Sequence, residues 1–200
     1  MTAVARVLDR AEVPVDTVRL ARFLIGKLVV RTLADGVAGG RIVETEAYDI
    51  GDAAGHAYRG MTKRNGALFL AHGHAYVYLA YGISFMLNVS SEAPGVGAGV
   101  LIRAIEPTCG IALMQRNRGT ERMRDLARGP GRLCSALEID RRLDGIDLCQ
   151  VGPLWIGTDG QAPDEIGQGK RIGITRAADS LLRFYVRGSR FVSGPLALNQ

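Results

Sequence analysis

Lysine is nearly absent from this basic chain, although the formal net charge is +5. Of the 25 Lys and Arg residues, only Lys27, Lys63 and Lys170 are lysine. The positive charge is therefore almost entirely arginine, whose planar guanidinium can pair with a phosphate through two parallel hydrogen bonds. A polyanion is a reasonable partner for such a chain, although an arginine-rich proteome would produce the same composition.

Cysteine and long apolar runs are also scarce. Cys109, Cys134 and Cys149 are odd in number and lack the paired spacing of a zinc site or a disulfide framework, so we expect reduced thiols in a cytoplasmic protein. No stretch approaches the roughly 18 apolar residues of a membrane span. The N-terminal residues do not follow the pattern of a secretory signal. We therefore expect a soluble protein with no membrane partner.

The chain has enough apolar residues for one sizeable core. Its 200 residues are 47% hydrophobic and contain no internal repeat, linker or low-complexity tract. This composition predicts a single domain over residues 1–200. Helical and strand periodicities both occur, so the pattern predicts a mixed α and β fold.

The most unusual stretch is residues 41–56, RIVETEAYDIGDAAGH. Read as a strand up to Tyr48, it places Glu44 and Glu46 on one face with that tyrosine, and small or β-branched residues on the other. The two carboxylates would lie roughly 7 Å apart and raise each other's pKa if water is partly excluded. A Gly/Asp/Ala loop then ends at His56. These groups at a strand-to-loop junction are typical of a catalytic site, although a structural network of carboxylates would have the same pattern.

A hairpin with an apolar tip is the second unusual feature. Residues 75–80 and 83–89 alternate as two strands, and the turn signal between them is Tyr81-Gly82. Hairpin tips are usually polar because water surrounds them, so Tyr81 and Ile83 would expose apolar surface unless another segment covers them. An exposed tip of this kind can serve as a wedge between stacked bases. The alternative is a tip that folds beneath another loop.

An arginine inside an apolar strand is the third unusual feature. Residues 98–104 predict a strand of mainly Val, Leu and Ile that also carries Arg103, and we expect this strand to end at Pro107. A charged side chain in such a run is usually paired, and Glu46 is a candidate partner. The two residues would then join two strands at the candidate site.

Basic residues also surround a predicted helix start. Residues 120–128 predict an amphipathic, basic helix, and Pro130 suits the first turn of another helix. Arg128 and Arg132 flank that turn, and with its free N–H groups they could hold a phosphate. A Gly-Pro-Gly run can also simply mark the start of a helix. Further along, residues 170–175 predict a strand.

With these motifs in order, the chain resembles the alkyladenine DNA glycosylases, also called the 3-methyladenine DNA glycosylases, from about Val18 to Ser193. The resemblance rests on GRIVETEAY, DAAGHAYRGMTKRN, YVYLAYGISFMLNVSS, VLIRAIEP, GPGRLCSAL, RIGITRAAD and RFYVRGS. It implies an α+β fold, in which a single domain has a curved, mostly antiparallel β-sheet flanked by helices. A protruding, DNA-intercalating β-hairpin would extend from that sheet.

The resemblance also assigns site residues by motif. The catalytic positions fall on Glu46, the second Glu of ETEAY, and on Arg103. The pocket for the extruded base would comprise Tyr48, His56, Tyr78 and Asn88, the last of which would screen out guanine. Contacts with DNA are expected from the hairpin tip, from the loop after His56 and from the basic helix start: Tyr81, Gly82 and Ile83; Thr62, Arg64 and Asn65; Arg128 and Arg132.

The reaction that the resemblance implies is hydrolysis of a damaged purine nucleotide in double-stranded DNA. The base would be turned out of the helix, and a water deprotonated by Glu46 would attack C1′ of the deoxyribose, leaving an abasic site. No lysine falls on a catalytic or pocket position, so we expect no Schiff-base step. The resemblance implies no metal or organic cofactor. We expect a monomer in the cytoplasm that associates with the nucleoid when bound to DNA.

Two other classes of protein remain possible from the residues. One is a non-catalytic nucleic-acid-binding module, in which the tyrosines stack on bases and Glu46 is structural. The other is a metal-dependent hydrolase that uses Glu44, Glu46 and His56, although no HExxH or comparable two-histidine spacing is present. Formation of abasic sites distinguishes a glycosylase from both. The sequence does not rank alkylated, deaminated and etheno-bridged purines as substrates.

Overall fold

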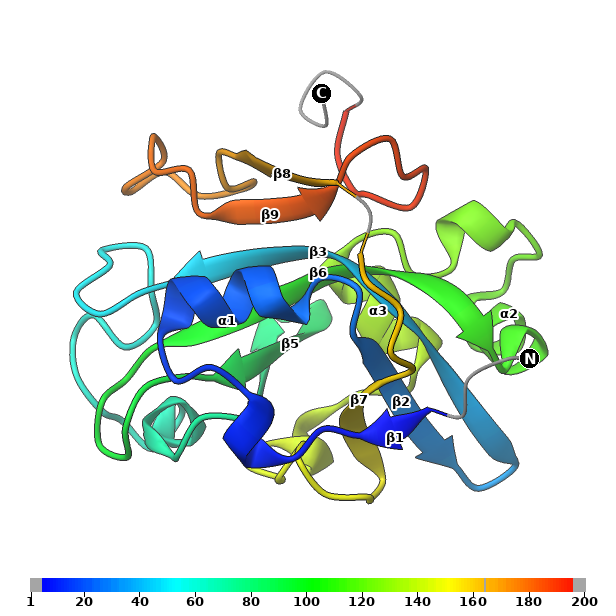
Figure 1. The fold of residues 1–200 in the computed structure, drawn as a ribbon, viewed down its shortest axis with the longest axis horizontal. Coiled ribbons are helices and arrows are strands. Elements are labelled where there is room, and N and C mark those ends of the chain that lie inside the picture. The colour runs from blue at the N-terminus through cyan, green and yellow to red at the C-terminus, as the bar shows by residue number, and fades with distance from the viewer. Residues whose placement is uncertain (1–4, 164, 196–200) are drawn as a thin grey trace.

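A computed structural model describes residues 5–163 and 165–195. One antiparallel sheet of nine strands dominates it, in the order β1-β7-β2-β3-β6-β5-β4, with β9 paired to β3 and β8 paired to β9 (Figure 1). The predicted α+β class with a curved antiparallel sheet and flanking helices is confirmed. The strands are β1 Arg6–Val7, β2 Leu28–Leu33, β3 Gly36–Tyr48, β4 Ala75–Ala80, β5 Ser84–Ser90, β6 Gly99–Cys109, β7 Leu154–Thr158, β8 Ile166–Gly169 and β9 Arg183–Val186.

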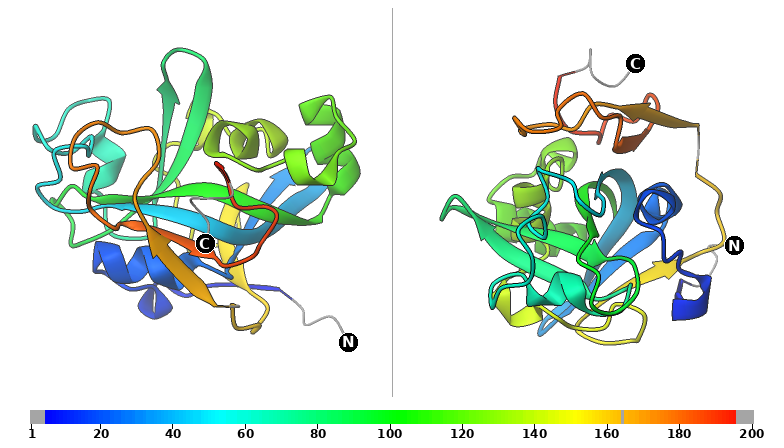
Figure 2. Two further views of the ribbon diagram at one scale, coloured as in Figure 1. Left: turned by 90° about the horizontal axis from the view of Figure 1, so that it is seen from above. Right: turned by 90° about the vertical axis from the view of Figure 1, so that its left-hand side faces the viewer.

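Helices cover both faces of the central strands β3 and β6. Helix α1 (Thr17–Leu24) lies on one side, and α2 (Ile111–Arg118) and α3 (Pro130–Ala136) lie on the other (Figure 2). α1 begins where the Asp16 carboxylate accepts a hydrogen bond from the backbone N–H of Arg19 at 2.7 Å, as expected for an N-cap. The helix is fixed to the sheet because the Thr45 hydroxyl of β3 donates to its Ala21 carbonyl at 2.8 Å.

Strand β3 is central because it changes its partner along one edge. Its first part, from Gly36 to Arg41, pairs with β2, and its later part, from Glu44 to Glu46, pairs with β9. Strand β6 runs along the other edge, with register irregularities on either side of Glu44. The strand is therefore covered on both faces, and the side chains of Glu44 and Glu46 are fully buried.

The β4–β5 hairpin projects from the rest of the sheet (Figure 2). Its turn has left-handed backbone at Tyr81 (φ 51°) and Gly82 (φ 70°), which matches the twist of the two strands. Tyr81 is 91% exposed and Ile83 is 84% exposed. The predicted turn is confirmed, and the alternative of a tip buried under another loop is wrong.

Strand β6 runs past the residue that was expected to end it. Pro107 pairs with Gly40, and Cys109 pairs with Gly39, so Thr108 is an extra residue on β6. Proline is tolerated at such a bulge because the hydrogen-bond ladder is already interrupted there.

Two other predicted elements are wrong because their backbones bind other parts of the chain. Residues 120–128 contain only a 3₁₀ turn, Met123–Asp125, since the following chain runs beside β6 and the Ala127 carbonyl accepts a hydrogen bond from Ile105 N–H at 3.3 Å. Residues 170–175 form no strand, because Ile172 donates its N–H to a side chain instead of a ladder.

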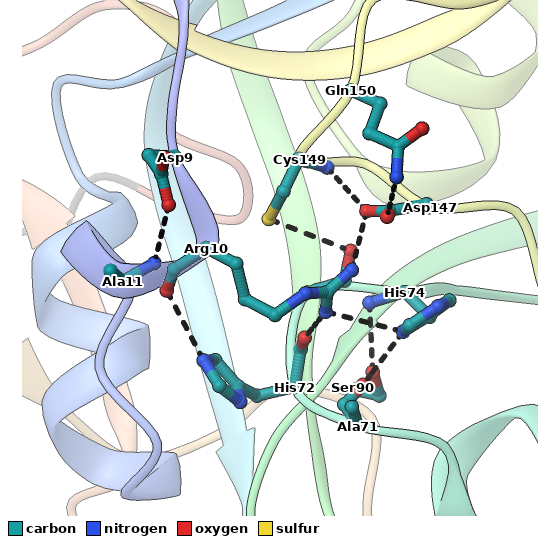
Figure 3. Close-up of polar contacts among 11 residues, drawn as sticks. Asp9, Arg10, Ala11, Ala71, His72, His74, Ser90, Asp147, Cys149 and Gln150 are labelled. Carbon is teal, nitrogen blue, oxygen red and sulfur yellow. Dashed lines mark hydrogen bonds and ion pairs between the residues drawn. The ribbon is translucent and has the colours of Figure 1, made fainter.

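The segment before α1 is fastened to the sheet by Arg10 (Figure 3). Its guanidinium pairs with Asp147 at 2.7 Å and donates to the carbonyl of His72, whose Nε2 lies 3.2 Å from the Arg10 carbonyl. Cys149 lies beside this cluster, and burial raises the pKa of its thiol to about 11, so the thiol is protonated at neutral pH. In the described parts of the chain, no group of three or more His, Cys, Asp or Glu side chains could hold a metal ion. No described helix is long and apolar enough to cross a membrane.

Candidate active site

A cavity of about 300 Å³ opens between the hairpin, the loop that follows β3 and the segment around Ile172. The residues that line it lie between positions 48 and 174, and they come from several segments that are separated in the sequence. Six of the predicted site residues contribute to it: Tyr48, His56, Tyr78, Tyr81, Asn88 and Arg103.

Glu46 lies directly beneath the floor of this cavity. One carboxylate oxygen accepts a hydrogen bond from Ile172 N–H at 2.7 Å and forms an ion pair with Arg103 Nη1 at 3.1 Å, and the other accepts a hydrogen bond from the Tyr48 hydroxyl at 3.0 Å. Tyr48 and Arg103 both line the cavity, so they form the layer between it and the carboxylate. The predicted pairing of Arg103 with Glu46 is confirmed.

Glu44, on the same strand, has a different set of partners and shares only Arg103 with Glu46. One of its oxygens accepts from Arg103 Nε at 3.1 Å and Arg183 Nε at 2.6 Å, and the other accepts from Ser193 N–H at 2.8 Å. Burial raises the pKa of Glu44, but the charges of the two arginines and the hydrogen bonds outweigh that effect and hold the pKa below its usual range. For Glu44, the expectation of a mutually raised pKa is therefore wrong, because the strand pattern does not reveal the arginines.

Aromatic rings and an imidazole form one wall of the cavity. The His56 ring lies edge-on to Tyr78 with 4.4 Å between centroids, and Tyr76 stacks behind Tyr78 at 5.3 Å. His56 Nδ1 is 2.9 Å from the Tyr76 hydroxyl. Desolvation beside these rings lowers the pKa of His56, and the charge of Arg64 lowers it further, so the imidazole is neutral at pH 7.

Tyr48 is held in position by a buried arginine. The Arg171 guanidinium lies over its ring, 4.7 Å from the centroid, and donates to the Ala47 carbonyl at 2.9 Å. Arg171 also forms an ion pair with Asp52 of the following loop. Burial, and then the charge of Glu46, raise the pKa of Tyr48, so its hydroxyl is protonated and donates to that carboxylate.

The loop assigned to DNA contacts is organised by Asn65. This side chain is 4% exposed, and its amide oxygen accepts from Thr62 N–H at 2.6 Å while its NH₂ group donates to the His56 carbonyl at 2.8 Å. Thr62 and Arg64 are exposed on the same loop. Asn65 thus shapes the loop that presents His56, and a contact of these residues with DNA stays a prediction.

Arg128 and Arg132 lie outside the cavity. They line a second hollow, between the hairpin and α3. Arg128 directs two nitrogens inward, to the carbonyls of Val192 and Gly194, each at 2.8 Å, and Arg132 pairs with Asp125 at 3.0 Å. Their predicted binding of a phosphate stays a prediction, and for Arg128 the structure adds a role in holding the C-terminal segment.

Comparison with known proteins places the chain in a family. A sequence profile described as methylpurine-DNA glycosylase matches residues 11–190. The chain belongs to the methylpurine-DNA glycosylase family. It is therefore a DNA glycosylase, an enzyme of base-excision repair, as the sequence resemblance implied.

Individual relatives align over nearly the whole chain. A protein of Mesorhizobium japonicum is 70% identical over 96% of this chain and 93% of its own length. Proteins of Paraburkholderia phytofirmans and Methanoculleus marisnigri are 52% and 48% identical, over 96% and 89% of this chain and 90% and 94% of their own lengths. All three relatives carry the provisional name 3-methyladenine DNA glycosylase.

Several residues of the glycosylase site had no role assigned from the sequence. Arg183 stands at the start of the apolar strand RFYV, which is the same signal that identified Arg103. Arg171 and Tyr76 lie within motifs that carried the resemblance, but nothing in their spacing indicated a contact with the cavity. The hydrogen bond from Ile172 has no sequence signal, because every residue other than proline has a backbone N–H.

Proposed function

We propose that this glycosylase turns a damaged purine out of duplex DNA into the cavity and hydrolyses its N-glycosidic bond with a water activated by Glu46. The observation that carries this proposal is the position of the carboxylate, under a cavity walled by Tyr48, Tyr78 and His56. Aromatic rings stack on flat bases, and the Tyr48 hydroxyl joins this aromatic lining to the carboxylate through a hydrogen bond of 3.0 Å.

The exposed tip of the hairpin supports the base-flipping step. Extruding a nucleotide leaves a gap in the stack, and an apolar side chain can fill it. Tyr81 suits this role because it is 91% exposed at the end of a projecting hairpin and also lines the cavity. The same residue would therefore lie between the emptied site in the helix and the extruded base.

The chemistry proposed for Glu46 is general-base catalysis. The water oxygen bonds to C1′ as the bond between C1′ and the purine nitrogen breaks, and the proton of the water passes to the carboxylate. The bonding electrons leave with the purine, which is charged already or takes up a proton. The negative carboxylate also favours the positive charge that develops on the sugar. Each carboxylate oxygen can accept two hydrogen bonds, so the oxygen that accepts from Tyr48 can also accept from a water.

Other residues of the cavity support the proposed substrate and reaction type. Asn88 is 6% exposed, and its NH₂ group donates to the Tyr76 carbonyl at 3.2 Å, so its amide is held in one orientation. We propose that this amide excludes the amino group of guanine and favours adenine-type lesions. No lysine is among the residues that line the cavity, which supports a monofunctional glycosylase without a Schiff-base step. We propose that it acts as a monomer on damaged duplex DNA.

The test is incubation with duplex oligonucleotides that each carry one lesion, namely hypoxanthine, ethenoadenine or a methylated purine. Alkaline cleavage after the reaction should reveal abasic sites at the lesion, and samples without alkali should keep an intact strand. An undamaged duplex is the control. If the protein binds the lesion duplexes tightly but forms no abasic site at any lesion, it would instead be a non-catalytic binding module.

A further inference from the structure

Four charged side chains are buried together beneath the cavity, and they carry two charges of each sign. Glu44 and Glu46 of β3 and Arg183 of β9 are fully buried, and Arg103 of β6 is 7% exposed. A buried charge without a partner is costly, so each member depends on the others. Only Glu46 has a role in the proposed reaction, and the other carboxylate needs an explanation.

Arg103 has each of its three nitrogen positions bound to a different acceptor. Nε donates to Glu44 at 3.1 Å, Nη1 lies 3.1 Å from Glu46, and Nη2 donates to the Ser193 hydroxyl at 3.2 Å. Because the guanidinium is planar, contacts at Nε and Nη2 fix its plane and direct Nη1 toward the Glu46 carboxylate. Glu44 therefore determines how Arg103 meets Glu46.

Arg183 is directly opposite Glu46 in the pairing of β9 with β3, so its side chain starts on the same face. Its Nε nevertheless binds Glu44, at 2.6 Å. Glu44 thus accepts from both arginines, and its charge opposes the positive field that they would otherwise apply to Glu46.

We propose that Glu44 and Arg183 are positioning residues of the hydrolytic reaction, which hold Arg103 in place and balance the charge around Glu46 so that it remains an effective base. This inference rests on the proposed role of Glu46. It assigns a function to a glutamate that lies outside the catalytic position and to an arginine on another strand.

Other polar groups face Glu46 and would be unchanged in the test. They are the hydroxyl of Tyr48, the more distant phenol of Tyr78, and the ion pair of Arg171 with Asp52 behind the Tyr48 ring. The variants below alter only Glu44 and Arg183, so a shift of the acidic limb arises from those two charges or from Arg103, which Glu44 holds beside Glu46.

The test is the pH dependence of the single-turnover rate on a hypoxanthine duplex. Glu44→Gln removes a negative charge near Glu46, so the acidic limb of the profile should move to lower pH and the plateau should fall, because the base is weaker. Arg183→Met removes a positive charge and should move the limb to higher pH. Two charges roughly 7 Å apart at an effective dielectric constant of about 20 interact by about 2.4 kcal/mol, which predicts shifts of about 1.7 pH units.

The double variant Glu44→Gln/Arg183→Met is the decisive case. It removes one charge of each sign, so its acidic limb should return close to that of the parent protein. It should also unfold at a higher temperature than at least one of the single variants, since neither single variant keeps the charge balance. Shifts of the two single variants in the same direction, or no shift in either, would overturn the proposal.

Asp159→Asn is the matched control, because it breaks the largely buried ion pair of Arg41 with Asp159 away from the cavity. It should lower the stability without moving the acidic limb. A shift of the limb in this variant would show that destabilisation alone alters the profile, and would overturn the inference.

Carbon-13 NMR of glutamate labelled at the side-chain carboxyl carbon separates failure of this inference from failure of the proposed function. The Glu46 signal is identified by its loss in Glu46→Gln, and its titration midpoint should move in opposite directions in the two single variants. If the midpoint moves this way but Glu46→Gln remains fully active, the charge balance stands and the proposed base is wrong. If Glu46→Gln is inactive and the midpoint is unmoved, Glu44 and Arg183 are structural only.

Discussion

At the scale of single residues, Glu44 and Glu46 differ in their partners although they lie on one face of one strand. Glu46 accepts hydrogen bonds from a tyrosine hydroxyl and a backbone N–H and forms an ion pair with one arginine, and all three of these partner residues line the cavity. Glu44 accepts from Arg103, Arg183 and the backbone N–H of Ser193, and of these three residues Arg103 alone lines the cavity. The geometry therefore favours Glu46 as the group that meets a substrate.

Substitution of Glu46 by glutamine should abolish most of the chemistry while keeping the fold. Glutamine keeps the volume and an acceptor oxygen for Arg103 or Ile172, but it cannot take a proton from water. General-base assistance contributes roughly 10²- to 10⁴-fold, so the single-turnover rate on hypoxanthine should fall by that factor. Affinity for the lesion duplex should hold or rise, which a gel-shift titration would measure.

The control for this variant is Glu106→Gln, the same chemical change on the neighbouring strand β6. Glu106 lines a different hollow from the one above Glu46. Its substitution should leave the single-turnover rate within a few-fold of the parent. Near-full activity of Glu46→Gln would mean that another group activates the water.

At the scale of elements, the β4–β5 hairpin is anchored to the rest of the protein at one end and exposed to solvent at its tip. Near its base, Val77 donates its N–H to Asp144 at 2.8 Å and accepts at its carbonyl from Arg141 at 2.9 Å. At its tip, Tyr81 has left-handed backbone although it is not glycine. Such a conformation in a bulky residue is uncommon and occurs often at functional sites.

Tyr81→Ser should weaken lesion capture and leave the thermal stability nearly unchanged, because the ring is almost entirely in solvent. Stacking of a base on an aromatic ring contributes about 1–3 kcal/mol, so the dissociation constant for a lesion duplex should rise roughly ten- to hundred-fold. Fluorescence anisotropy with a labelled duplex would measure it, and thermal melting would test the fold.

Val151→Ser provides the matched control, since Val151 is 78% exposed and lies away from the hairpin. It should change neither DNA affinity nor stability. A large fall in the melting temperature of Tyr81→Ser would show that Tyr81 packs against the protein and does not serve as a wedge.

At the scale of the whole molecule, the excess of arginine should govern binding to undamaged DNA. With a net charge of +5 and exposed basic residues such as Arg64 and Arg132, the affinity for plain duplex should fall steeply as salt is raised, because binding releases condensed counterions. The expected result is a linear fall of the logarithm of the association constant against the logarithm of the salt concentration. An affinity that is insensitive to salt, or strong preference for one undamaged sequence, would contradict it.

Acid should destabilise the fold partly through Glu44. The folded protein holds the pKa of Glu44 below the usual glutamate value of about 4.3, so the ionised Glu44 carboxylate stabilises the protein above that pH. This contribution is lost as the pH falls through the lower pKa of the folded state. Glu44→Gln leaves two buried arginines with one carboxylate and should cost about 3–5 kcal/mol at pH 7. Urea unfolding should show this difference shrinking below about pH 4. A difference that stays constant down to pH 3 would exclude the ion pair as its source.

The sequence by itself determined the features that follow from the type of residue at one position. The start of α1 at Asp16, the turn at Tyr81-Gly82 and the pairing of Arg103 with Glu46 follow from caps, turn chemistry and the cost of a lone buried charge. The motifs also contain most of the residues that line the cavity, although only six of these residues were assigned a role in the site.

Tertiary structure alone decided the contacts that join distant parts of the chain. Arg183 meets Glu44 across 139 positions, and Ile172 meets Glu46 across 126. Neither distance has a periodicity that a local pattern could reveal, and a backbone N–H has no residue type to identify it. Asn65 turned inward for the same reason, because its partners are backbone groups of its own loop. The environment of the Glu46 carboxylate is therefore a property of the folded chain.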